Sequence, residues 1–159
     1  MSNSVENLPL TNARKYIDYI IILVNCICAQ IVKMFTSTDE HFLSKNFFQK
    51  LGASGGSPSA HTTVVVSTAC INWLNHGFQS SITMVSIIMM IIIIYDAMGV
   101  RNHVTKLNKI IKSLIPDDNH ASHPYLNNNI GHTPMEVLKG LLFGSIMTLF
   151  LKKTSKLAL

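Results

Sequence analysis

The chain has 159 residues, enough for one domain of ordinary size. Only 13% of them are Asp, Glu, Lys or Arg, about half the share in soluble proteins, whereas the apolar share of 48% is ordinary. No such charge occurs in the 45 residues from Leu51 to Tyr95. This composition excludes a disordered chain and a disulfide-stapled secreted module, and it predicts a membrane protein with several spans.

The net charge of +5 does not indicate a nucleic-acid partner. Its basic residues are dispersed along the chain, and aromatic residues make up only 8%. Nucleic-acid binding ordinarily needs a dense basic face with aromatic platforms. We therefore expect a membrane environment and no nucleic acid.

Four apolar segments cover about residues 16–35, 60–74, 82–100 and 135–151. The first and third approach the roughly 20 residues that span a hydrocarbon core. The second and fourth are shorter and partly polar, so we expect them to be buried against other helices. The predicted fold is all-α, a polytopic membrane bundle of about four core helices within a single domain over 1–159.

A fifth, amphipathic helix is predicted over 103–115, with lysines opposite an apolar stripe. It either lies in the headgroup plane against anionic lipid or packs its stripe on the other helices. We expect residues 1–15 to form a polar N-terminal tail and residues 116–130 an exposed loop.

If all four apolar segments cross the membrane, the connections between the first and second and between the third and fourth lie on one face. Four polar groups then meet there, namely Lys33, Gly55–His61, Asp96–Arg101 and Gly131–Glu136. This coincidence predicts a single site.

Two of these groups predict helix starts. Ser57–Pro58 and Thr133–Pro134 each place a good N-cap residue before a proline. Backbone N–H groups at a helix start attract anions, and Gly56 allows close approach of the backbone. With Lys33 and Arg101 nearby, the pocket suits phosphate.

Three of the polar residues have alternative roles. Glu136 either orients His132, four residues before it, or closes a capping box with Thr133. His61 is either a site residue or a hydrogen-bonded interfacial histidine. Asp96 either belongs to the site or only pairs with Arg101. Polar contacts between helices are expected at Asp18, Asn25 and Gln30.

These motifs resemble those of a known superfamily. Pro58–His61 resembles the Pro-Ser-Gly-His motif of type 2 phosphatidic acid phosphatases and vanadium haloperoxidases, and His132–Val137 resembles their third motif. Together with Asp96–Arg101, the pattern over about 30–149 resembles the divergent branch of small bacterial and plastid membrane proteins.

The resemblance implies a role for each matched residue. His132 would be the nucleophile that forms a phosphohistidine, Glu136 would orient it, and His61 would protonate the leaving oxygen. The phosphate would be bound by the following residues and the backbone around them: Lys33, Gly56, Ser59, Ala60 and Arg101.

The chain also departs from the superfamily pattern. No Arg-Pro pair follows Lys33, and Arg101 lies 31 positions before His132 instead of close to it. Ala60 replaces the motif glycine. Asp96 has no counterpart, and its carboxylate would oppose phosphate unless it is paired or binds a metal.

The expected function is hydrolysis of a lipid phosphate or diphosphate by an integral membrane phosphatase. The alternative is a non-catalytic membrane protein that binds or transports a phosphorylated ligand. We expect no cofactor, although phosphate or vanadate would bind as an anion, and we expect a lipid phosphate substrate and a possible homodimer. The expected location is the inner (plasma) membrane of a bacterium, with several spans. Both faces carry basic residues, so charge does not orient the chain.

Overall fold

The computed structural model describes residues 8–36, 56–115 and 131–157. They form five helices and, within these ranges, no strand, which confirms the all-α fold. The helices are α1 (Leu8–Thr36), α4 (Ala60–His76), α5 (Ser81–Met98), α6 (Val100–Leu114) and α7 (Pro134–Leu157).

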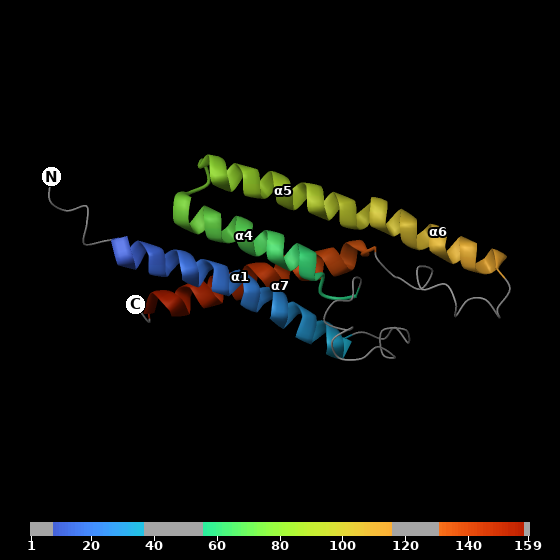
Figure 1. The fold of residues 1–159 in the computed structure, drawn as a ribbon, viewed down its shortest axis with the longest axis horizontal. Coiled ribbons are helices and arrows are strands. Elements are labelled where there is room, and N and C mark those ends of the chain that lie inside the picture. Colours follow the sequence, from blue (N-terminus) through green and yellow to red (C-terminus); the bar gives the residue numbers. More distant parts are fainter. Residues whose placement is uncertain (1–7, 37–55, 116–130, 158–159) are drawn as a thin grey trace.

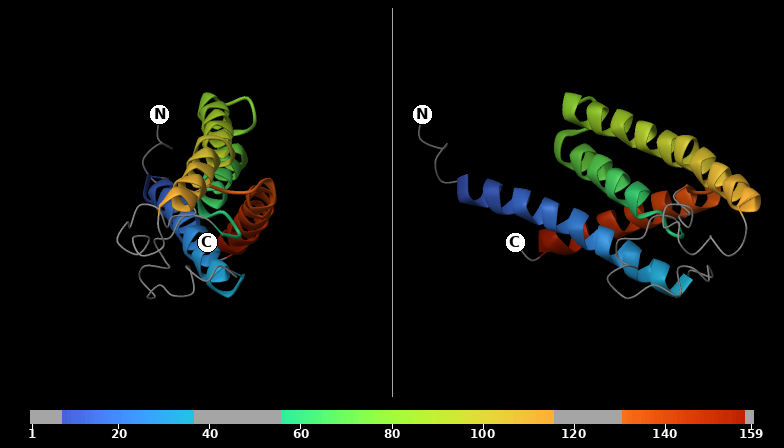
Figure 2. Two further views of the ribbon diagram at one scale, coloured as in Figure 1. Left: turned by 90° about the vertical axis from the view of Figure 1, so that its right-hand side faces the viewer. Right: turned by 45° about the vertical axis from the view of Figure 1, so that its right-hand side comes forward.

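Helix α4 is the central helix of the bundle and contacts α1, α5 and α7 (Figure 1). Helices α1 and α7 cross each other on one side of α4, whereas α5 runs along its other side (Figure 2). Helix α6 follows α5 almost end to end after a break at Gly99. The start of α4 therefore lies at the same end of the bundle as the ends of α1 and α5 and the start of α7.

All four predicted apolar segments are helical, but two helices are longer than expected. The prediction of a polar tail over 1–15 was wrong in part, because α1 begins at Leu8. Proline is tolerated in a first helical turn, and Ala, Arg and Lys favour a helix, so Pro9–Lys15 extends α1. Helix α7 continues past residue 151 to Leu157. The loop predicted over 116–130 lies outside the described residues.

Three stretches of the described helices are long and apolar enough to cross a membrane: Tyr16–Thr36, Ser81–Leu114 and Pro134–Ser155. Helix α4 has 17 residues and contains seven buried ones, which confirms that the second segment is enclosed by other helices. We expected the same of the fourth segment. Instead α7 contains a candidate span of 22 residues, along which apolar side chains such as Leu138, Leu142 and Ile146 are exposed.

The interior of the bundle is polar. Asn25 of α1 is fully buried, and its Nδ2 donates to Ser67 of α4 and Thr148 of α7, at 2.8 Å each. At the end remote from the predicted site, Asp18 pairs with Lys152 at 2.5 Å and accepts from Asn75. These contacts confirm the expected roles of Asn25 and Asp18 in joining helices. In lipid, where no water can satisfy polar groups, such bonds favour helix association.

Helices α4 and α7 approach most closely at Gly140 and Gly144. A Cβ atom at Gly144 would lie 2.4 Å from Cγ1 of Val66 and 2.9 Å from the Thr63 carbonyl oxygen. A Cβ atom at Gly140 would lie 2.8 Å from the carbonyl oxygen of Ser59. This is the packing typical of a Gly-x-x-x-Gly pattern in membrane helices, where small residues let backbones meet.

Helix α6 exposes its apolar stripe. Leu107, Ile110 and Leu114 are all exposed, and Thr105 is the buried residue of this helix within the described part of the chain. The alternative in which the stripe packs on the other described helices was therefore wrong. An exposed stripe opposite lysines is the pattern expected of an interfacial helix.

The close contact of α7 with α4 at Gly140 and Gly144, here called the glycine seam, can be tested by substitution. Replacement Gly144→Val should lower the free energy of unfolding by about 2 kcal/mol or more, because the added atoms overlap Val66 and the Thr63 backbone. Chemical denaturation in detergent measures it. The control is Ile146→Val on the exposed face of α7, which should change little. Equal stability of the two variants would contradict the tight seam.

Candidate functional site

Two histidines from distant parts of the sequence meet at one end of the bundle. His61 lies in the first turn of α4, and His132 comes two residues before α7. Their ring centroids are 6.3 Å apart, with the rings edge to face at 80°. His132 is only 2% exposed, whereas His61 is exposed. The predicted convergence of the second and fourth helix starts is present in the structure.

The junction of α5 and α6 holds the segment that carries His132. The His132 amide donates to the Ala97 carbonyl at 3.1 Å, and the Gly131 amide donates to Oγ1 of Thr105 at 3.0 Å. A Cβ atom at Gly131 would lie 2.5 Å from Cα of Asn102. This segment therefore needs glycine at 131 to reach its place, and backbone bonds fix His132.

The surroundings of His132 keep its imidazole neutral. Burial lowers the pKa of His132 to about 4, against an ordinary value of 6.5. The positive charges of Lys33 and Arg101 act in the same direction, while Glu136 opposes them. The Nδ1 atom of His132 is buried without a hydrogen-bond partner among the described residues. A neutral imidazole at neutral pH has a free electron pair for nucleophilic attack.

Glu136 closes the capping box at the start of α7. Its Oε2 accepts from the Thr133 amide at 2.7 Å, and its own amide donates to Oγ1 of Thr133 at 3.3 Å. Within the described residues, no hydrogen bond joins Glu136 to His132. Of the two roles considered for Glu136, the capping role is therefore the one present in this structure.

The start of α4 differs from the prediction. Ser57 and Pro58 precede the helix and are joined by a cis peptide bond, and the N-cap is Ser59. The buried Ser59 hydroxyl accepts from the amide and the hydroxyl of Thr62. Since Ser59 satisfies the standard N-cap role, the expected cap at Ser57 was wrong. The Ser59 hydroxyl is therefore engaged by Thr62 within the first turn of α4.

Two backbone amides at this helix start nevertheless remain unused by the described residues. The amides of Ala60 and His61 lie in the first turn, where no described residue accepts from them. The Ser59 amide donates to the Glu136 carbonyl at 3.3 Å, so it is already used. Two free backbone donors at the positive end of a helix favour an anion.

Lys33 approaches this turn from the end of α1. It is only 2% exposed, and its Nζ donates to Oε1 of Gln30 at 3.2 Å. Its side chain passes beneath Gly56, where a Cβ atom would lie 3.2 Å from Cγ of Lys33. Gly56 also has a positive φ of 80°, which glycine adopts without strain. A buried ammonium needs an anionic or polar partner.

Asp96 pairs with Arg101 across the break between α5 and α6. The Nε atom of Arg101 lies 2.5 Å from Oδ2 of Asp96, with each side chain about a third exposed. Of the two roles considered for Asp96, pairing is the one observed, and it neutralises a carboxylate near the site. The terminal guanidinium nitrogens of Arg101 donate to no described residue, so they are available to a ligand.

No metal site is apparent among the described residues, where no three or more His, Cys, Asp or Glu side chains gather. The donors instead suit an anion: two cations, two backbone amides and a neutral, buried imidazole. This is an arrangement that can hold a phosphoryl group and attack its phosphorus.

Comparison with known proteins shows the family of this chain. Residues 17–147 match the model of the family described as the divergent PAP2 family. This chain belongs to the divergent PAP2 family. It is also 33% identical over 113 residues to the uncharacterized membrane protein YuiD of Bacillus subtilis (strain 168), over 62% of this chain and 72% of that protein. No solved structure matches it.

Sequence reasoning missed several residues that position the candidate site of this family member. Ala97 and Thr105 position His132 through its backbone segment, and no sequence pattern marks them. Gly140 and Gly144 had a readable signal, the Gly-x-x-x-Gly spacing in an apolar helix.

The burial of His132 predicts its titration. Its imidazole should stay neutral at pH 6 and take up a proton near pH 4, observed by NMR of 15N-histidine protein in detergent and assigned by comparison with His132→Gln. Between these values the unfolded chain binds a proton that the folded chain does not, so stability should fall as pH decreases below 6.5. A midpoint at pH 6 or above would contradict this.

Proposed function

We propose that this divergent PAP2 family member hydrolyses a lipid phosphate or diphosphate through a phosphohistidine intermediate. The observation that carries the proposal is the pair of His61 and His132, with rings 6.3 Å apart beside the charges of Lys33 and Arg101. A neutral nucleophile and a second histidine near one anion pocket are the groups that stepwise phosphoryl transfer requires.

In the proposed reaction, the phosphoryl group lies between Lys33, Arg101 and the first turn of α4. Nε2 of neutral His132 attacks phosphorus in line with the leaving oxygen, and a P–N bond replaces the P–O bond. Burial and the charges of Arg101 and Lys33 lower the pKa of His61, so it becomes protonated only beside the anionic phosphoryl group, and it then gives its proton to the leaving oxygen. Neutral His61 then takes a proton from water, whose oxygen attacks phosphorus and releases phosphate and His132.

The cations act on charge that develops during the reaction. Lys33 is almost fully buried, so water weakens its field little, and the field is strong at the phosphoryl oxygens. Arg101 contributes its terminal nitrogens while Asp96 holds its Nε atom in place.

A second candidate function is binding or transport of a phosphorylated ligand without turnover. It is favoured by one observation, the Nδ1 atom of His132, which has no hydrogen-bond partner within residues 8–36, 56–115 and 131–157 to orient the ring. The anion pocket is the same in both proposals. They differ in whether a phosphohistidine forms.

Phosphate release separates these candidates. The purified protein in detergent should release phosphate from at least one of phosphatidic acid, phosphatidylglycerol phosphate and isoprenyl diphosphates. His132→Ala and His61→Ala should each reduce the rate by a factor of about 100 or more. His76→Ala, at the opposite end of α4, is the matched control and should retain activity. Activity that survives both site changes would overturn the proposal, and saturable vanadate binding without release would favour the second candidate.

Glu136→Gln tests whether this carboxylate has a role beyond capping. Glutamine can replace glutamate in a capping box, so the helix start is preserved. If Glu136 turns to Nδ1 of His132 during the reaction, kcat should fall by a factor of about 10 to 100 while thermal stability is unchanged. Equal kcat in both proteins would limit Glu136 to capping.

A further inference from the structure

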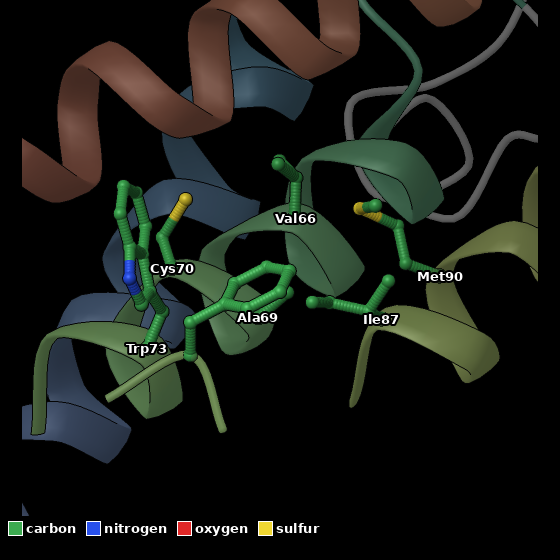
Figure 3. Close-up of a pocket in the computed structure, with 7 residues that line it drawn as sticks. Val66, Ala69, Cys70, Trp73, Ile87 and Met90 are labelled. Carbon is green, nitrogen blue, oxygen red and sulfur yellow. The ribbon is translucent and has the colours of Figure 1, made fainter. Parts of the chain in front are cut away.

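Two apolar surfaces of the bundle lie outside the candidate site. The first is an apolar cavity of about 200 Å³ between α4 and α5, whose lining includes Val66, Trp73 and Ile87 (Figure 3). It lies on the membrane-spanning part of the bundle, where lipid covers apolar side chains without another protein. The second is the apolar stripe of α6, whose position along the bundle is different.

Helix α6 leaves the membrane at the end of the bundle that holds the candidate site. Helix α5 has 18 residues and rises about 27 Å, close to the thickness of about 30 Å of a hydrocarbon core. Helix α6 continues α5 almost end to end, and Figure 1 shows most of it beyond the ends of α1 and α7. An interfacial helix would instead run across the direction of α5, in the headgroup plane. The stripe therefore faces water, and burial against protein would stabilise it.

The spacing of the stripe is that of a coiled coil. Its residues recur at alternating intervals of four and three, and each is between 36% and 78% exposed: Val100, Val104, Leu107, Ile111 and Leu114. In a heptad with positions a to g, Val104 and Ile111 occupy a, whereas Leu107 and Leu114 occupy d. β-Branched residues at a with leucine at d favour a parallel pair of helices. The pattern therefore indicates that the stripe packs against one parallel helix.

The flanking positions of these heptads suit a second copy of α6. In a parallel pair, position g of one helix meets position e of the next heptad in the other helix. These contacts would join His103 to Asn108 and Ile110 to Ile115, so they oppose no two lysines or arginines. The lysines of α6 all occupy positions b, c and f, on the outer side of such a pair: Lys106, Lys109 and Lys112.

The stripe also faces away from the segment that carries His132. Gly131 of that segment lies against Asn102 and Thr105 of α6. At 100° per residue, these two residues lie on the side of the helix opposite the stripe. Two copies can therefore meet along α6 without displacing either candidate site. Copies inserted in a membrane in the same orientation also present α6 in the same direction, as a parallel pair requires.

We propose that the α6 stripe packs against the same stripe of a second copy, forming a parallel two-stranded coiled coil just outside the membrane. Two heptads alone form a weak coiled coil, because short helices are marginal in water. Here α5 anchors each copy in one membrane, which raises the local concentration of the partner helix. The inference concerns assembly and is independent of the proposed function.

Cysteine crosslinking along α6 tests this packing. In the full-length protein, the native cysteines are replaced by alanine, and one new cysteine is introduced at a time: Cys26, Cys28 and Cys70 are the native ones. In membranes treated with a mild oxidant, Leu107→Cys and Leu114→Cys should form disulfide-linked dimers about 10-fold faster than the matched control Lys109→Cys, because d positions of a parallel pair face each other. Equal rates at 107 and 109 would overturn the proposal, and they are the result expected of a helix that lies on the lipid surface.

Counting chains in vesicles tests whether the stripe holds the two copies together. The full-length protein with a C-terminal fluorescent protein is reconstituted at high dilution, and bleaching steps are counted for each fluorescent spot. The unaltered protein should bleach in two steps, whereas Leu107→Asp should bleach in one, since two carboxylates would face each other in an apolar seam. Ser113→Asp, at position c, is the matched control and should bleach in two steps. Circular dichroism shows whether each variant keeps its helix content.

Three results would contradict the proposed seam. The first is a single bleaching step for the unaltered protein. The second is a folded Leu107→Asp variant that still bleaches in two steps, because the copies would then meet along another face. The third is equal dissociation of the Leu107→Asp and Ser113→Asp variants, because any added charge on α6 would then separate the copies.

Discussion

The close approach of α4 and α7 is the contact on which the site depends. Gly140 and Gly144 let the two backbones meet where any side chain would collide with Thr63, Val66 or Ser59. His61 stands at the start of one of these helices, and His132 immediately precedes the other. The distance between the histidines therefore depends on the spacing of these two helix axes, which Gly140 and Gly144 allow, and on the bond from the His132 amide to Ala97.

Polar contacts determine which helices share this seam and in what register. Asn25 binds a hydroxyl on α4 and another on α7, so sliding either helix by one turn would leave an amide without partners in an apolar medium. The same two hydroxyls donate back to carbonyls of their own helices, Ser67 to Thr63 and Thr148 to Gly144. The outward faces carry the apolar residues, as expected where lipid replaces water as the solvent.

Much of the fold and of the candidate site could be predicted because charged residues are scarce in the sequence. The helices follow from the apolar segments. If each segment crosses the membrane once, the ends that carry Lys33, His61, Arg101 and His132 lie on the same face. What could not be predicted are choices between partners at similar spacing. Glu136 can reach the Thr133 amide or His132, and both Ser57 and Ser59 can cap α4. Such choices depend on side-chain directions and on contacts made by other helices, here the carbonyl of Glu136 that accepts from the Ser59 amide.

The ion pair between Asp18 and Lys152, with Asn75 bridging both, gives the bundle a mechanical asymmetry. It ties α1, α4 and α7 together at one end, about 30 Å along α7 from His132. If α7 is treated as a rigid rod pivoting at Lys152, a tilt of 2° moves His132 by about 1 Å. Misplacement by that distance can cost an enzyme a factor of about 100 in rate. The backbone bonds that join His132 to Ala97 and Glu136 to Ser59 oppose such a tilt and so keep the two histidines in place.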